Sequence, residues 1–207
     1  MAIVARNLEG VGIVAVSAAR ALPLPEAQTI FALYQGDNAK GARLLDDPAL
    51  HMRSFIFPAL SSQITFEPTR FRLDATEPKK PAELPLGREM GTIVEKAYPA
   101  HSFDRFGFNY DIAYQYDVVI AQREILATFL DKDTIEDTTH FGWQFTLSKE
   151  KGTRRETYFC KVVSPLEIRV LTNIEFDKPL PPTADLQKLY EKCYVECQDI
   201  VEHFRIK

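Results

Sequence analysis

Polar residues on one long predicted strand carry functional groups that could bind a ligand. Across residues 103–117, aromatic or aliphatic side chains alternate with polar or small ones. Because successive side chains of a strand point to opposite faces, this alternation predicts one apolar face and one polar face. The polar face would carry Arg105, Asn109, Asp111 and Gln115. If Arg72 from a neighbouring strand aligns with them, the face would offer guanidinium, amide and carboxylate groups to a polar or anionic ligand.

Two other interpretations of this polar face remain open at the level of sequence. A sheet face with mixed charges is commonly solvated by water and needs no ligand. Small residues on the same face, Gly107 and Ala113, leave room for close approach by another chain. A protein partner or self-association is therefore expected, and a small polar or anionic ligand is the alternative occupant.

The sequence carries no recognisable catalytic or metal-binding signature. It contains no GxSxG elbow, HExxH motif, phosphate-binding loop or GxGxxG fingerprint, and its four histidines are scattered. Cys193 and Cys197 lie one helical turn apart and could present two thiolates to one ion. Both belong to an apolar stripe, however, so we interpret them as core residues. No metal or cofactor is predicted, and a non-enzymatic role is favoured over an enzymatic one.

The composition is that of an ordinary globular protein and disfavours nucleic acid as a partner. Of the 207 residues, 45% are hydrophobic and 26% are charged, and the formal net charge is -4. Neither half of the chain has the basic surplus that phosphate-backbone binding requires. The chain has only 3 cysteines, too few for a disulfide scaffold. No run approaches the ~20 apolar residues that span a membrane, so we expect a cytoplasmic protein without a membrane partner.

The first half of the chain predicts strands separated by short helices. The segment from Val11 to Val16 is rich in β-branched residues, and we interpret it as a buried strand rather than the apolar part of a targeting signal. The expected elements are strands at 3–6 and 11–16 joined by a turn at 7–10, a helix from Pro25 to Tyr34, a short helix at 42–52 that contains Pro48, and strands at 62–67 and 70–75.

The second half predicts helices around a run of alternating strands. Prolines and lysines at 76–85 indicate an exposed loop. Helices are expected at 86–98, where Gly87 and Gly91 interrupt an apolar stripe, and at 118–130, whereas alternation at 143–147, 157–163 and 168–176 predicts an antiparallel meander. A long C-terminal helix at 183–204 carries one continuous apolar face.

Together these elements predict an α+β fold. Strands that alternate so regularly favour a largely antiparallel, twisted sheet of about six to eight strands, with helices packed on one face. We expect residues 1–207 to form a single domain. The predicted function is a non-enzymatic binding or interaction module that uses a polar sheet face or edge. The alternative is a small-molecule pocket or an enzyme with a polar cavity around the strand at 103–117.

Overall fold

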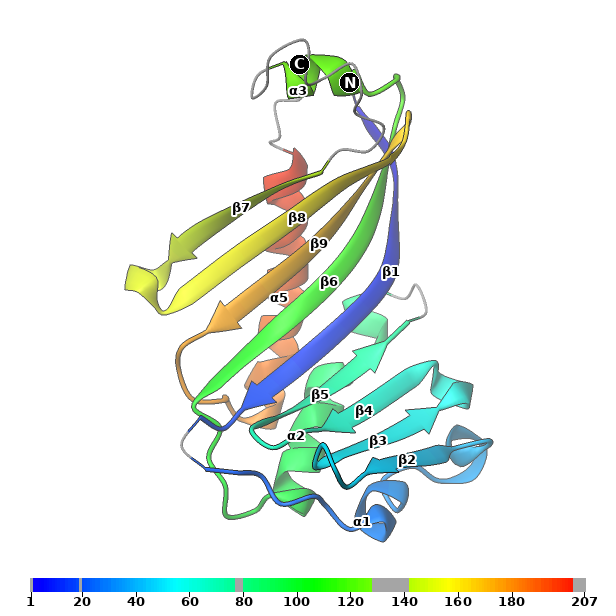
Figure 1. The fold of residues 1–207 in the computed structure, drawn as a ribbon, viewed down its shortest axis with the longest axis vertical. Helices are drawn as coiled ribbons and strands as arrows, with labels where there is room; N and C mark the ends of the chain where they lie inside the picture. Colours follow the sequence, from blue (N-terminus) through cyan, green and yellow to red (C-terminus); the bar gives the residue numbers. More distant parts are fainter. Residues whose placement is uncertain (1, 19, 77–79, 128–141, 203–207) are drawn as a thin grey trace.

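One antiparallel sheet of nine strands organises the chain. The computed structural model describes residues 2–18, 20–76, 80–127 and 142–202. Within them the strand order is β2-β3-β4-β5-β1-β6-β9-β8-β7 (Figure 1). The strands are β1 (Ile3–Val16), β2 (Arg43–Asp47), β3 (Met52–Phe57), β4 (Ser62–Phe66), β5 (Arg70–Ala75), β6 (Arg105–Tyr116), β7 (Gly142–Lys149), β8 (Arg154–Ser164) and β9 (Glu167–Phe176).

Four α-helices and four short 3-10 turns accompany these strands within the described residues. The helices are α1 (Ala27–Phe31), α2 (Leu86–Ala97), α3 (Gln122–Leu126) and α5 (Thr183–Glu202), and the turns are η1 (Gly36–Ala39), η2 (Pro58–Leu60), η3 (Pro81–Glu83) and η4 (Glu150–Gly152). The α+β class, the antiparallel sheet and the long C-terminal helix are thus confirmed. The strand count of nine exceeds the predicted six to eight because two strands replace a predicted helix, although two other predicted strands merge into one.

The first strand is longer than predicted. Residues 7–10 do not form a turn, and β1 continues through them to pair with β6 along its whole length. Register shifts between Leu8 and Gly10 take up the irregularity that the sequence suggests. The predicted pairing of 3–6 with 11–16 was therefore wrong, because β6 pairs with β1 from Ile3 to Val16 and β5 pairs with residues 11–16 on the other side.

The predicted helix at 42–52 was also wrong, since β2 and β3 form a hairpin there. Arg43–Asp47 pairs with Met52–Phe57, and Pro48 lies in the turn between them. The Asp47 carboxylate accepts hydrogen bonds from the backbone N–H groups of Ala49 and Leu50, each at 3.1 Å. The Asp47 side chain stabilises the turn, and Pro48 is unfavourable inside a helix. These two preferences outweigh the weak helical spacing of the apolar residues.

Three other segments differ from the prediction in extent. Helix α1 ends at Phe31 and continues to Tyr34 only as hydrogen-bonded turns. Of the helix expected at 118–130, the described residues show only α3, because the Ile120 N–H donates instead to Pro165 O at 2.6 Å; residues 128–130 lie outside the described residues. The predicted loop is described at residues 76 and 80–85. Residues 80–85 contain η3 and pack on α5, where the Gln187 side chain donates to carbonyl oxygens.

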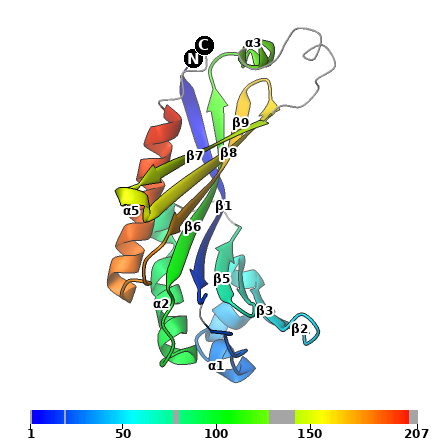
Figure 2. The ribbon, with the colours of Figure 1, turned by 60° about the vertical axis from the view of Figure 1, so that its left-hand side comes forward.

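Both long helices cover the same face of the sheet. Figure 2 shows α2 and α5 together on one side of the strands. The aromatic face of β6 is buried beneath them, as predicted: the Tyr110 ring stacks on Tyr190 of α5 at 5.6 Å between ring centroids, and its hydroxyl donates to the Tyr190 carbonyl at 2.5 Å. Cys193 and Cys197 lie in the same layer and are buried, which confirms their interpretation as core residues.

The glycines of α2 allow it to approach α5 closely. A Cβ atom at Gly87 would lie 2.6 Å from the Gln187 Cα, and one at Gly91 would collide with the Thr183 side chain. Larger residues would therefore force the helices apart. Gly87 also donates its backbone N–H to the Gln187 side-chain oxygen at 2.8 Å, which satisfies one donor at the start of α2.

A buried ionic network joins α5 to the sheet near β8. Arg154 lies within 2.6 Å of carboxylate oxygens on both Glu156 and Glu196. Tyr158 donates to Glu156 at 2.8 Å, and the Lys149 ammonium lies 2.9 Å from the same carboxylate. Glu156 is fully buried, so these partners replace the water that it loses on folding.

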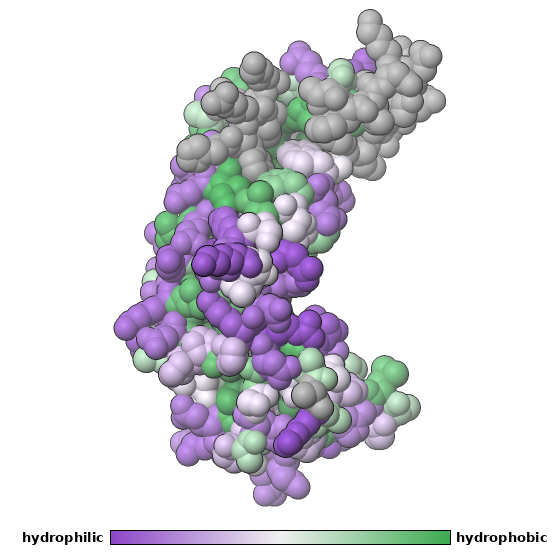
Figure 3. Space-filling view, turned by 90° about the vertical axis from the view of Figure 1, so that its left-hand side faces the viewer, coloured by the Kyte–Doolittle hydropathy of each residue, from purple (hydrophilic) through white to green (hydrophobic). Residues whose placement is uncertain are grey.

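The opposite face of the sheet is not covered by α2 or α5. Figure 3 shows the molecule in profile, with this open face hollowed on the right and bordered largely by hydrophilic residues. No helix in the described ranges is both long enough and apolar enough to cross a membrane.

Candidate functional site

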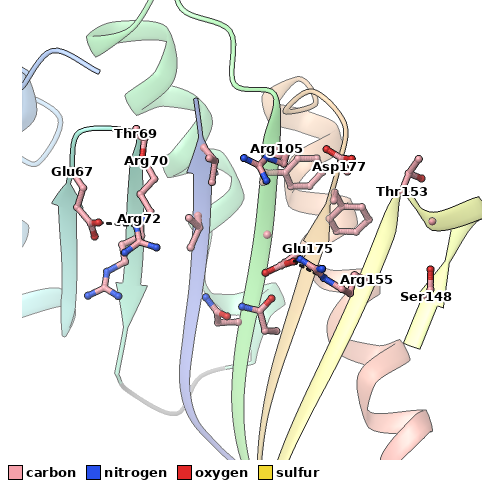
Figure 4. Close-up of a pocket in the computed structure, with 18 residues that line it drawn as sticks. Glu67, Thr69, Arg70, Arg72, Arg105, Ser148, Thr153, Arg155, Glu175 and Asp177 are labelled. Atoms are coloured by element: carbon pink, nitrogen blue, oxygen red, sulfur yellow. Dashed lines mark hydrogen bonds and ion pairs between the residues drawn. The ribbon is translucent and has the colours of Figure 1, made fainter. Parts of the chain in front are cut away.

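The hollow on the open face is the principal candidate site. It has a volume of about 990 Å³ and is lined by side chains of six neighbouring strands and their adjoining turns (Figure 4). At the scale of small-molecule sites, which run to about 1,000 Å³, this is a large space. It extends across the strands rather than along one of them, so strand register decides which residues line it.

One row of directly opposed residues forms the floor of the hollow. From β5 to β7 the row is Arg72, Val14, Gly107, Glu175, Arg155 and Ser148. Arginines thus lie toward both ends of this row. Val14 and Gly107, which have small side chains or none, leave open space between them. Gly107 has a local role as well, because a Cβ there would lie 2.8 Å from the Ile174 carbonyl oxygen.

The next row toward the other end of the strands is entirely polar apart from Gly12. It consists of Asp74, Gly12, Asn109, Asn173, Thr157 and Thr146. The absence of a side chain at Gly12 gives the Asp74 carboxylate room, since a Cβ at Gly12 would lie 2.6 Å from Asp74 Oδ1. Burial raises the pKa of Asp74, and the positive charge of Arg72 opposes that rise. The facing amides of Asn109 and Asn173 can each donate and accept hydrogen bonds.

Three of the four arginines that line the hollow have acidic neighbours. Arg70 contacts Glu67 at 2.7 Å, Arg72 contacts Asp74 at 3.2 Å, and Arg155 pairs with Glu175. These arginines are exposed, so their ion pairs are weak and can exchange for a ligand's charge. Arg105, at the start of β6, is also exposed and forms no ion pair with any described residue. It is the cation of the hollow most readily available to an incoming anion.

The structure brings three of the five sequence-predicted residues together in the hollow. Arg72, Arg105 and Asn109 line it, as predicted for aligned strands. Asp111 lies beyond the lining and is engaged by Arg169 through two hydrogen bonds of 2.7 and 2.5 Å. Gln115 lies farther along the same face, opposite Ala5 and Glu167, and does not line the hollow.

Several residues of the hollow were missed in the sequence because their placement depends on pairing. Asn173, Glu175 and Arg155 come from the meander, and only the β6–β9–β8 register places them beside Asn109 and Gly107. Their alternation with buried residues was a usable signal for their face. It carried no information about which strand would lie next to β6.

An apolar patch adjoins the polar floor. Phe159 and Leu171 oppose each other on β8 and β9, one row beyond Asn173, and each is 42% exposed. We call Phe159 and Leu171 the apolar patch. An elongated ligand could contact both the polar hollow and this patch.

Groups suited to other chemistry lie away from the hollow. Burial raises the pKa of the Cys193 thiol to about 12, although the Arg154 charge opposes the shift, so the thiol stays protonated at neutral pH. Among the residues that the structure describes, no three His, Cys, Asp or Glu side chains are grouped to hold a metal ion. Comparison of the sequence with protein-family models and with curated proteins finds no match.

Proposed function

We propose that the chain is a non-enzymatic binding module whose open sheet face accepts an acidic segment of a polypeptide partner. The supporting observation is the hollow of about 990 Å³, which four arginines and two facing asparagine amides line together. A cation that lacks an ion pair among the described residues, Arg105, stands at the end of this space.

The charge pattern of the hollow favours a polypeptide over a nucleic acid. Glu67, Glu175 and Asp177 line it together with the arginines. These carboxylates would repel a continuous phosphate backbone, whereas a peptide with isolated acidic residues can avoid them. The amides of Asn109 and Asn173 match the donors and acceptors of a peptide backbone.

The apolar patch supports the same choice of partner. Interfaces between proteins combine an apolar centre with polar groups at the edge, and Phe159 and Leu171 supply exposed apolar area next to the hollow. A partner segment that carries both acidic and apolar side chains would use both regions.

Binding of a designed peptide tests the proposal. Six strands at a spacing of about 4.8 Å span about 24 Å, which an extended peptide of about seven residues matches. The probe is therefore a fluorescein-labelled peptide of that length in which glutamates and leucines occur in pairs, so that each side of the extended peptide carries both residue types. The readout is fluorescence anisotropy. We expect saturable binding that Arg105→Ala weakens about tenfold, because a charge-assisted hydrogen bond is lost.

A matched control separates the hollow from general electrostatics. Arg123 on α3 is also exposed but does not line the hollow, so Arg123→Ala should leave the affinity unchanged. Equal weakening by both substitutions, or no saturable binding to the wild-type protein, would contradict the proposal.

A small polar ligand is a second candidate, and the facing amides of Asn109 and Asn173 favour it. Such a ligand would sit on the floor of the hollow without reaching the apolar patch. Titration with citrate distinguishes the two candidates: a small-ligand site binds citrate more tightly than the peptide and is insensitive to Phe159→Ser. A peptide site shows the reverse order and loses affinity in that variant.

A further inference from the structure

A second cavity lies on the helix-covered side of the sheet, between α2 and the strands β4 and β5. Its volume is about 450 Å³, near the lower end of the range for small-molecule sites. Much of its wall is apolar and includes Leu33, Leu60, Leu84 and Ile93. The cavity shares no lining residue with the hollow on the open face.

Ser62 provides a buried hydroxyl without a partner in this wall. The residue is 7% exposed, and its Oγ forms no hydrogen bond within the described parts of the chain. Ser62 opposes Phe57 on β3 and Ala75 on β5, both of which face the core. Its hydroxyl therefore points to the helix-covered side, where the cavity lies. A buried hydroxyl without a partner is unfavourable, and a bound ligand can satisfy it.

A carboxylate and a phenol face the same cavity. The Tyr34 ring stacks on Phe57 with 4.0 Å between ring centroids, and its hydroxyl donates to Glu89 Oε2 at 3.5 Å, the outer limit of a hydrogen bond. Glu89 of α2 forms no ion pair with the described residues. Burial raises the pKa of Glu89, and the hydrogen bond from Tyr34 offsets only part of that rise.

The remaining charged residues of the cavity wall are solvent-exposed. Glu83 of η3 and Arg88 of α2 both line the cavity, and both are exposed, as is the amide residue Asn38. Water screens the charges of these groups, so Glu89 is the carboxylate that a ligand inside the cavity would meet.

We propose that this cavity is a binding site for a small amphipathic amine, with the apolar body against the leucines, the ammonium group on Glu89 and a hydrogen bond to Ser62. Apolar walls with a few convergent polar groups are typical of small-molecule sites. A cation fits better than an anion because the partly buried Glu89 carboxylate has no positive partner among the described residues. An ammonium group supplies a positively charged partner for the Glu89 carboxylate and an N–H donor for the Ser62 hydroxyl oxygen.

Three probes of nearly equal size but different charge test this site: phenethylamine, phenethyl alcohol and hydrocinnamate. Binding is followed by amide chemical-shift changes in NMR spectra of the full chain. We expect phenethylamine to shift the amides of Ser62, Glu89 and Ile93 and to bind about tenfold more tightly than the alcohol, with hydrocinnamate weakest. Its affinity should fall as the solution is acidified, because burial raises the pKa of Glu89 and protonation removes the negative charge that binds the ammonium group.

Two variants and a control test which residues cause the preference for the amine over the alcohol. Glu89→Gln should remove the difference between amine and alcohol, and Ser62→Ala should weaken amine binding a few-fold while the protein stays folded. Glu83→Gln, which changes an exposed carboxylate of the same wall, should leave the difference intact. The proposal is overturned if amine and alcohol bind equally to the wild-type protein or if Glu89→Gln keeps the preference. It is also overturned if no probe shifts the cavity residues at about 10 mM, a concentration about ten times the ~1 mM Kd of a weak ligand.

Discussion

Arg154 and Arg155 are neighbours in the sequence, yet they lie on opposite faces of the sheet and differ in environment. Arg154 is 4% exposed and bonded to Glu156 and Glu196 beneath α5, whereas the Arg155 side chain is 64% exposed and pairs with Glu175 in the hollow. The period of two along a strand places consecutive side chains in such different surroundings. The same guanidinium group therefore anchors a helix on one face and is available to a partner on the other.

The two faces differ in whether their ion pairs are buried or exposed to solvent. On the covered face, the Glu156 carboxylate accepts a hydrogen bond from the Tyr158 hydroxyl and forms ion pairs with both Arg154 and Lys149. On the open face, solvent screens the ion pairs, and they cost little to rearrange. Structure depends on the first kind of pairing, and exchangeable binding requires the second.

The largest expected effect comes from Arg154→Ala. The substitution leaves fully buried Glu156 with only Lys149 as a cationic neighbour and removes the link to Glu196 on α5. We expect the free energy of unfolding to fall by about 3–5 kcal/mol, as when one partner of a buried pair is removed. Urea denaturation followed by circular dichroism measures it.

A double substitution serves as the control for that prediction. Arg154→Met combined with Glu156→Leu removes both buried charges and keeps apolar volume, so it should recover most of the loss. If the double variant is no more stable than Arg154→Ala, an uncompensated charge is not the cause of the destabilisation.

A smaller, pH-dependent effect is expected for Glu196→Gln. Burial by itself would raise the pKa of Glu196, but the hydrogen bond and charge of Arg154, together with Lys192, lower it overall. A carboxylate with a lowered pKa stabilises the folded state above its unfolded pKa, and this contribution is lost as the pH falls through the folded value. Glu196→Gln should therefore destabilise by about 1 kcal/mol at neutral pH, allowing for its partial exposure, and by less at about pH 3.

Denaturation of wild-type and Glu196→Gln proteins across this pH range measures the difference. A stability difference that stays constant, or that grows as the solution becomes acidic, would show that Glu196 is not held in its charged form by Arg154. Asp185→Asn, at an exposed position in the first turn of the same helix, is the control for a general change in charge.

The smallest effect on stability is expected for Arg155→Ala. Its pair with Glu175 is solvated, so the denaturation midpoint should not change measurably. Affinity for the acidic peptide probe should nevertheless fall several-fold, because Arg155 lines the hollow. A clear loss of stability would mean that the open face contributes to folding as the covered face does.

The elements with regular alternation or a clear apolar stripe were predicted well. Apolar residues recur with the period of two typical of strands in β6 and in the meander β7–β8–β9. They recur with the helical period in α2 and α5. The prediction failed at 7–10 and 42–52, where a bulged strand and a hairpin replaced a turn and a helix. At 42–52 the local turn at Asp47 and Pro48 outweighed the weak helical spacing. At 7–10 the partner strand β6, which is distant in sequence, decided the outcome.

The candidate site was predicted only in part for the same reason. The polar face of β6 correctly indicated Arg105 and Asn109 as neighbours on one surface, and Arg72 joins them through β5 and β1. Asp111 shares that face but is held by Arg169, which no local pattern links to it. The cavity beside Ser62 had no sequence signal, because its walls come from segments that are separate along the chain.

The sequence by itself determined which side chains of each strand share a face, because the direction of a side chain is a local property of an extended backbone. It also determined that the aromatic face of β6 would be buried, because the hydrophobic effect acts wherever such a face can be covered. Only the tertiary structure decided the order and register of the strands. It thereby placed Arg72, Gly107, Glu175 and Arg155 in one row across the hollow, since pairing between strands depends on residues far apart in the chain.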